Sequence, residues 1–232
     1  MNNYSNNRQV VNDNAGLNQF LTKMYGWMSI AVLVSAATAY YFGNVLSPLV
    51  LVQNQWVMWG SLILWFVMPM IISVQAMKRP TLSFVILMVY AVVSGVFFSS
   101  IFITYTGTSI AAAFLSSSAI FISMTAYGLI TKRSLARWGA QASAALIALI
   151  IAMVINIFLK SSLISFVFSI IAVIIFTILT AYDTQRIKNM YNQYGGQVSE
   201  NGLAVYGALQ LYLDFVNLFL QLLSIFGYGD NK

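Results

Sequence analysis

The sequence predicts an all-α, multi-pass membrane protein with seven transmembrane helices. Of its 232 residues 60% are hydrophobic and only 7% are charged, and the mean hydropathy is +0.82. Soluble globular domains do not reach these values. Seven apolar segments follow one another along the chain, each near the roughly 20 residues that a helix needs to cross a bilayer. The last segment carries an aspartate near its middle, so we expect the other helices to be arranged around it.

The segments are joined by short connections, which indicates one transmembrane domain over residues 23–227. A polar, asparagine-rich tail (1–22) precedes it and a short tail (228–232) follows. No signal peptide is visible in the first tail. Only Lys160, Ser161 and Ser162 separate the fifth segment from the sixth, which predicts a tight antiparallel hairpin. The seven segments are Tyr25–Phe42, Gln55–Val74, Thr81–Ile103, Ser109–Ile130, Ala140–Leu159, Leu163–Tyr182 and Leu203–Phe226.

Small and polar residues inside these segments are expected to act mainly in packing. Ser94 and Gly95 would let two helices approach closely, and Asn156 would form a hydrogen bond between helices.

The basic residues predict an orientation. Nine lie on one side of the predicted membrane and two, Lys160 and Lys232, on the other. Because cytoplasmic loops carry the excess of Lys and Arg, the amino terminus is expected in the cytoplasm and the carboxyl terminus outside or in the periplasm. The nine are Arg8, Lys23, Lys78, Arg79, Lys132, Arg133, Arg137, Arg186 and Lys188.

The seventh segment has a polar stripe along one helical face. Its members are spaced three or four residues apart, as residues on one side of a helix are. They are Gly207, Gln210, Asp214, Asn217, Gln221 and Ser224. A carboxylate at the centre of a spanning helix costs about 2.5 to 3.5 kcal/mol on insertion scales, so Asp214 should face protein or a water-filled cavity. The stripe therefore indicates an ion or proton route, or else hydrogen bonds that only hold helices together.

A second carboxylate, Asp183, ends the sixth segment. The remaining acids, Asp13, Glu200 and Asp230, lie in tails or loops. If the sixth helix continues through Arg186 and Lys188, Asp183 could lie below the membrane surface and meet Asp214. The alternative is that Asp183 lies at the membrane interface and pairs with Arg186 three residues later.

Two carboxylates in a poorly solvated site should share a proton and titrate as a unit. Lower pH would then close the pair, and higher pH would split it or recruit a cation. Ca²⁺ prefers oxygen ligands, which Asp183, Asp214 and the neighbouring amides can supply. The chain has no cysteine or histidine, which excludes disulfides, thiolate or imidazole metal sites and nucleophilic triads that use these residues.

The stretches AYDTQRIKNMY (181–191) and LYLDFVNLFLQLLSIFG (211–227) resemble the Bax inhibitor-1 family, in particular its bacterial branch. The motifs YGWM (25–28) and TYTGTSIAAAF (104–114) extend this resemblance over about residues 21–227. It implies six helices around a central seventh, a di-aspartyl pH sensor formed by Asp183 and Asp214, and a pH-dependent Ca²⁺ leak. Family members can also carry a basic latch for the aspartates. The candidates here are Lys78, Arg79 and Arg186.

We therefore expect a pH-sensitive cation leak channel of the inner membrane, with Ca²⁺ as the ion and Gln210, Asn217 and Gln221 lining the path. No cofactor, enzymatic activity or nucleic-acid partner is expected. Intramembrane aspartyl proteolysis is an alternative, but residues 211–214 lack the expected Gly-x-Gly-Asp arrangement. Some bacterial relatives resemble modulators of an ATP-dependent membrane protease, so the other alternative is a regulator that binds such a protease or another membrane protein.

Overall fold

A computed structural model describes residues 14–44 and 55–230, and this part of the chain is helical throughout apart from short turns. Six spans are long and apolar enough to cross a membrane, with α4 and α5 counted together, and α3 adds a shorter apolar stretch, Ile63–Gln75. The expected all-α, multi-pass architecture is confirmed. The helices are α1 (Asn14–Asn44), α3 (Gln55–Gln75), α4 (Pro80–Phe98), α5 (Ile101–Thr104), α6 (Gly107–Ile130), α7 (Ala136–Leu159), α8 (Ser162–Tyr194) and α9 (Glu200–Asp230).

Local capping sets several of these boundaries. The Ser161 hydroxyl accepts a hydrogen bond from the Ile164 N–H and so caps the first turn of α8. Lys160 ends α7 in the left-handed conformation, with φ 52°. This residue reverses the chain between α7 and α8, which pack against each other, so the predicted hairpin is confirmed. Pro80 opens α4, where its missing N–H has no helical partner to lose.

Three helices differ most from the predicted segments. α1 begins at Asn14, inside the predicted tail, because Phe20 is fully buried and stacks on Tyr191 of α8 with ring centroids 4.5 Å apart. The third segment is divided between α4 and α5 at Ser99 and Ser100, whose hydroxyls donate to carbonyls of the preceding turn. α8 continues twelve residues beyond the predicted span end at Tyr182, to Tyr194.

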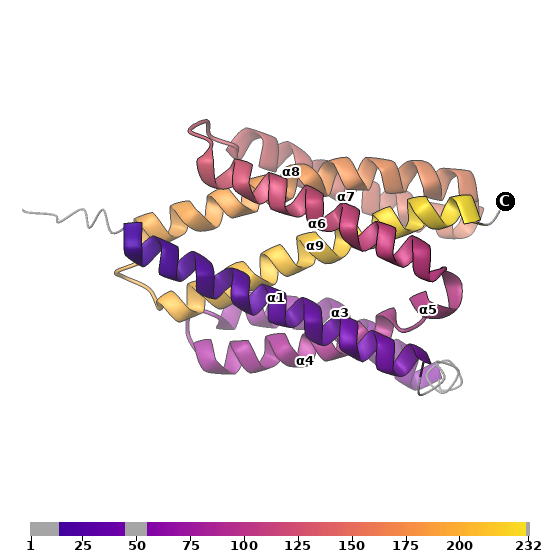
Figure 1. Ribbon diagram of the computed structural model, residues 1–232, viewed down its shortest axis with the longest axis horizontal. Helices are drawn as coiled ribbons and strands as arrows, with labels where there is room; N and C mark the ends of the chain where they lie inside the picture. Colours follow the sequence, from indigo (N-terminus) through magenta and orange to yellow (C-terminus); the bar gives the residue numbers. More distant parts are fainter. Residues whose placement is uncertain (1–13, 45–54, 231–232) are drawn as a thin grey trace, which may run out of the picture.

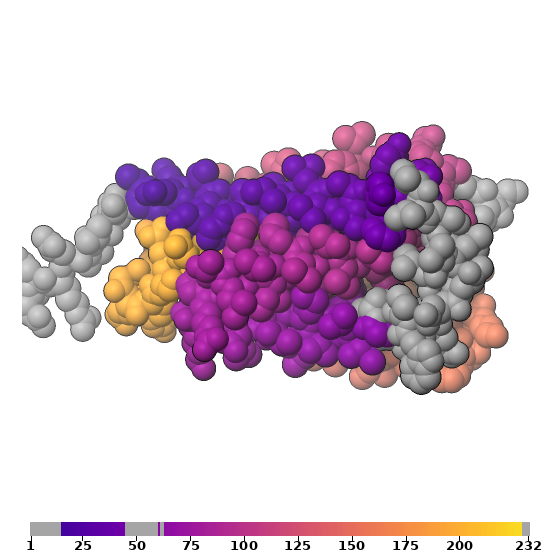
Figure 2. Space-filling view, turned by 90° about the horizontal axis from the view of Figure 1, so that it is seen from below, coloured from indigo at the N-terminus to yellow at the C-terminus, as the bar shows by residue number. Residues whose placement is uncertain are grey.

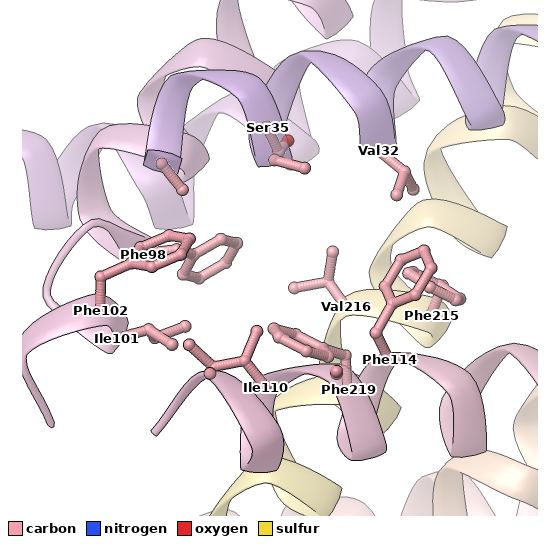
Figure 3. Close-up of a pocket in the computed structure, with 14 residues that line it drawn as sticks. Val32, Ser35, Phe98, Ile101, Phe102, Ile110, Phe114, Phe215, Val216 and Phe219 are labelled. Atoms are coloured by element: carbon pink, nitrogen blue, oxygen red, sulfur yellow. The ribbon is translucent and has the colours of Figure 1, made fainter. Parts of the chain in front are cut away.

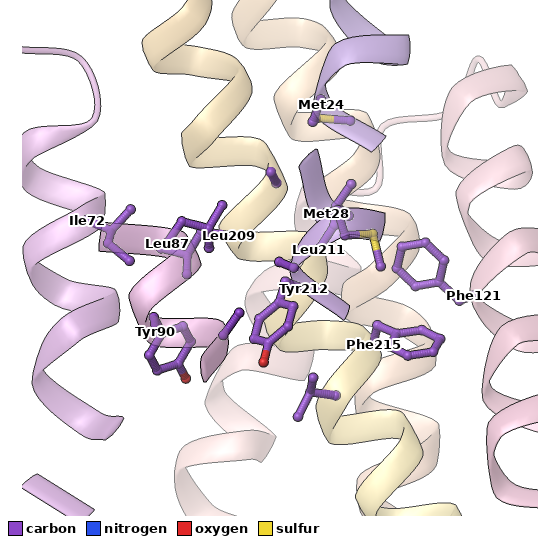
Figure 4. Close-up of a cluster of buried hydrophobic side chains, with 14 of the residues drawn as sticks. Met24, Met28, Ile72, Leu87, Tyr90, Phe121, Leu209, Leu211, Tyr212 and Phe215 are labelled. Carbon is purple, nitrogen blue, oxygen red and sulfur yellow. The ribbon is translucent and has the colours of Figure 1, made fainter. Parts of the chain in front are cut away.

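α9 is the central helix of the bundle (Figure 1). It packs against α1, α3, α4, α6 and α8, and half of its most apolar window is buried, the largest share of any span. Buried side chains of α9 such as Leu209, Leu211 and Tyr212 meet residues of α1, α3, α4 and α6 in one continuous core (Figure 4). The central position of the seventh helix, implied by the family resemblance, is confirmed.

The outer helices lie along the length of the molecule. α1 and α4 run side by side over one face, and the region where α8 gives way to α9 projects at the end where α1 begins (Figure 2). The α3–α4, α6–α7 and α8–α9 connections lie at this same end, whereas α9 finishes at the opposite end (Figure 1). The basic residues of those connections are therefore gathered at one end of the bundle. Arg8 and Lys232 lie outside the described residues.

The close approach predicted for Gly95 is present between α4 and α1. A Cβ atom added to Gly95 would lie 2.5 Å from the Ser35 carbonyl oxygen and 2.5 Å from the Thr38 Cβ. The helix backbones can therefore approach this closely only because residue 95 has no side chain. Asn156 likewise behaves as predicted, since its Nδ2 donates to the Ser165 hydroxyl of α8 at 2.7 Å.

Candidate functional site

A cavity of about 580 Å³ lies between α3, α4, α7, α8 and α9. Apolar side chains make up most of its wall, and the charged and amide-bearing side chains come from α8 and α9. These polar lining residues are Asp183, Arg186, Gln210, Asp214, Asn217 and Gln221. The two aspartates of the sequence analysis therefore line one cavity, together with the three amide residues expected along the path.

Helical periodicity positions the α9 part of this lining. Gln210, Asp214, Asn217 and Gln221 are three or four residues apart, so one face of α9 presents all four to the cavity. Ser224, further along the stripe, accepts a hydrogen bond from the Ser169 hydroxyl of α8 at 3.0 Å. The part of the stripe from Gln210 to Gln221 thus lines a cavity, and its last member, Ser224, joins α9 to α8.

Asp214 lies deep in the bundle. It is 5% exposed and is fourteen residues from the start of α9, or about 21 Å along the helix axis. Within the described part of the chain its Oδ2 atom has no hydrogen-bond partner. Burial of an unpaired carboxylate oxygen is costly, so this atom is suited to take up a proton or a cation.

Asp183 is buried as well, on the neighbouring helix. It is 9% exposed, and its Oδ1 lies 3.8 Å from Nη1 of Arg186, whose side chain is about half exposed. Its carboxylate lines the same cavity as that of Asp214. Asp183 is therefore buried within the bundle and is also paired with Arg186 three residues later.

Other candidates for the basic latch lie elsewhere. Lys78 and Arg79 are exposed in the turn between α3 and α4 and do not line the cavity in the described structure. Arg186 is the basic residue that lines it. Among the described residues, no three aspartate, glutamate, histidine or cysteine side chains cluster closely enough to hold a metal ion together. The cavity thus offers a cation two carboxylates and neighbouring amides.

Polar residues of α8 that do not line the cavity hold this helix in place. The Gln185 amide accepts from the Leu135 N–H at 2.8 Å and donates to the Arg133 carbonyl at 2.9 Å. Lys188 Nζ donates to the Leu129 carbonyl at the end of α6, at 2.6 Å. These bonds fix the end of α8 that carries Asp183 against the α6–α7 connection. These hydrogen bonds were not predicted, because nothing in the sequence indicates that α8 packs against the α6–α7 connection.

Tyr90 is a lining residue that the sequence analysis did not identify. It comes from α4 and is 1% exposed, and its ring lies 5.8 Å from that of Tyr212 on α9 in a T-shaped contact (Figure 4). The Tyr212 hydroxyl is 2.7 Å from that of Ser35 on α1. Tyrosines are common in the chain, and only the packing of α4 on α9 brings this one to the cavity.

Comparisons with known proteins agree on one family. A family model described as inhibitor of apoptosis-promoting Bax1 matches residues 17–231. The inner membrane protein YbhL of Escherichia coli is 36% identical over 231 residues, covering 98% of this chain and 99% of YbhL. A membrane protein of Streptococcus pyogenes serotype M3 is 38% identical over 220 residues, covering 93% and 95% of the two chains. The protein YrjE of Lactococcus lactis is 37% identical over 229 residues, covering 94% of each.

Proposed function

The chain belongs to the Bax inhibitor-1 family of membrane proteins, and on this premise we propose that it mediates a pH-sensitive cation leak, with Ca²⁺ as the expected ion. The observation that carries the proposal is the presence of two buried carboxylates, Asp183 and Asp214, on adjacent helices of one intramembrane cavity. Ionisable residues within membrane spans are costly and usually serve ion or proton pathways.

Proton sharing would provide the pH sensitivity. With one proton between them, the two carboxylates carry a single negative charge and can hydrogen-bond to each other. Loss of that proton leaves two like charges in a poorly solvated cavity. The pair then repels itself and attracts a cation, so its arrangement depends on pH. Arg186 beside Asp183 would favour the ionised form of that residue.

A cation leaving this pair would meet further oxygen ligands. Gln210, Asn217 and Gln221 follow the same face of α9 through the cavity. Amide and carboxylate oxygens are ligands that Ca²⁺ accepts, and a site with few charges binds it weakly enough to release it. The proposal requires neither a cofactor nor an enzymatic reaction.

We further propose that the end of the bundle with the α3–α4, α6–α7 and α8–α9 connections faces the cytoplasm. These connections hold Lys78, Arg79, Lys132 and Arg133, whereas Lys160 lies in the α7–α8 turn at the other end. The excess of basic residues in short connections sets orientation in the membrane. Cysteines introduced singly into the two ends and labelled with an impermeant reagent test this assignment.

The test of the leak is Ca²⁺ flux into liposomes containing the purified protein, measured from about pH 6 to 8, the range in which buried carboxylates can titrate. Wild-type protein is expected to show a flux that varies with pH. Asp183→Asn and Asp214→Asn should each remove the pH dependence, because the amide cannot lose the proton. Glu200→Gln, which neutralises an acid at the start of α9 outside the cavity, is the matched control and should retain the wild-type profile.

A wild-type pH profile in Asp214→Asn contradicts the sensor. A flux no greater than that of empty liposomes at every pH contradicts the leak and favours the other proposal, a regulator of a membrane protease or of another membrane protein. Deletion of the amino-terminal tail then tests whether the tail binds that partner.

A further inference from the structure

A second cavity, of about 360 Å³, lies between α1, α4, α5, α6 and α9 (Figure 3). Phenylalanine rings and aliphatic side chains form nearly all of its wall. The polar side chain in the lining is Ser35, whose hydroxyl already bonds to the Ala31 and Ala91 carbonyls and to the Tyr212 hydroxyl. Among the described residues, the lining therefore offers a water molecule or a polar ligand no side-chain hydrogen-bonding group that lacks a partner.

Small residues on α1 and α6 form the mouth of this cavity. Ala36 and Ala111 are exposed at its rim, and Phe114 beside them is 43% exposed. α1 and α6 both pack on α9, which crosses between them in Figure 1. Both are membrane-spanning helices, so the mouth between them opens toward lipid rather than toward water.

The cavity lies near one end of the bundle and is somewhat shorter than the roughly 15 Å of hydrocarbon in one leaflet. Its lining on α6 starts at Gly107, the first residue of the helix, and reaches Phe114, about 10 Å further along the axis. The inner wall is formed by residues of α9 that are almost fully buried, Phe215 and Val216 at 7% and 6% exposure. A chain that enters between α1 and α6 would therefore lie against the central helix.

We propose that this cavity binds one acyl chain of a phospholipid from the surrounding leaflet. Its volume is at the lower end of the roughly 300 to 1,000 Å³ typical of ligand cavities. Left empty, its lining would lose dispersion contacts that an occupant restores. Acyl chains are the molecules that surround the mouth, and they are as apolar as the lining. Binding of one chain therefore depends on how well its shape fits the cavity.

An acyl chain at this position contacts α9 immediately after Asp214, on a different face of the helix. Phe215, Val216 and Phe219 line the lipid cavity, while Asp214 and Asn217 line the polar one. The bound chain would therefore support α9 from the side opposite to the carboxylates. An influence of the lipid on ion flux rests on the proposed function, whereas binding of the chain does not.

The test is photocrosslinking in liposomes made with a phospholipid that carries a diazirine in one acyl chain, followed by mass spectrometry of the labelled peptides. Label is expected on the buried residues Phe215 and Val216 as well as on outward residues such as Leu115, which is 68% exposed. A lipid that only covers the surface cannot reach the buried pair. Label confined to outward residues in wild-type protein overturns the proposal.

Adjacent alanines of α1 provide a matched pair of variants. Ala36 lines the cavity and Ala37 is exposed without lining it. Ala36→Trp should abolish labelling of Phe215 and Val216, and Ala37→Trp should leave it intact, with Leu115 labelled in both. Equal labelling of the buried pair in the two variants overturns the proposal. Because labelling is measured without ion flux, a failure here is separate from a failure of the leak.

Discussion

Replacement of Gly95 by alanine should destabilise the protein, whereas the same replacement at Gly26 should not. An added Cβ at Gly95 would lie 2.5 Å from the Ser35 carbonyl oxygen, while at Gly26, exposed on α1, nothing lies within 4 Å. An ordinary contact begins at 3.4 Å, so α1 and α4 would have to separate by about 0.9 Å. The obstructing atom belongs to a helix backbone and cannot rotate away.

The expected changes in stability have opposite signs for Gly95→Ala and Gly26→Ala. Overpacking of a close contact costs about 1 to 3 kcal/mol, and alanine gains roughly 1 kcal/mol over glycine inside a helix, so the net loss at Gly95 is up to about 2 kcal/mol. At about 2 to 4 °C per kcal/mol for a chain of this size, Gly95→Ala should lower Tm by several degrees and Gly26→Ala should raise it slightly. Tryptophan fluorescence during thermal unfolding in detergent measures both. Equal Tm values for the two variants would refute the close-packing argument.

Substitutions at two further positions, Arg186 and Asn156, test the polar contacts of α8. Arg186→Gln should move the pH dependence of flux to higher pH, because the guanidinium 3.8 Å from Asp183 no longer favours the ionised carboxylate. Arg79→Gln, at an exposed position outside the cavity, is the control and should leave the profile unchanged. Equal profiles for the two variants would exclude Arg186 from the site. Asn156→Ala should lower the free energy of unfolding by about 1 to 3 kcal/mol, because it removes the hydrogen bond to Ser165 and leaves a cavity. Asn156→Leu should lower it less, because leucine fills the space and removes the unpaired Oδ1. Thermal unfolding measures both variants, and the reverse order would contradict this account.

Helix periodicity made much of the site predictable. The spacing of Gln210, Asp214, Asn217 and Gln221 on one face follows from the geometry of a single helix, and the structure has all four lining one cavity. The condition that contact between the aspartates places on the sixth helix is also met, because α8 continues past Asp183 through Arg186 and Lys188. Such predictions need only the relation of a residue to its own helix.

Contacts between helices were not predictable in the same way. Arg186 was one of three basic candidates, and only the fold shows that it lines the cavity while Lys78 and Arg79 lie in an exposed turn. The role of Tyr90 depends on the packing of α4 against α9. The hydrogen bonds of Gln185 depend on the packing of the α6–α7 connection against α8. Hydropathy cannot supply this information, because lipid-facing and helix-facing apolar residues have the same composition.

The sequence by itself determined the class of the protein, its helices, the polar face of α9 and the two acids of the membrane domain, since these follow from composition and from the repeat of one helix. The tertiary structure decided which helices meet. It brought Asp183 and Asp214 to one cavity and left a second, apolar cavity on another face of the same helix. The physical reason is that helix pairing in a bilayer depends on close fit, such as that of Gly95 against Ser35, and close fit is a property of two surfaces together.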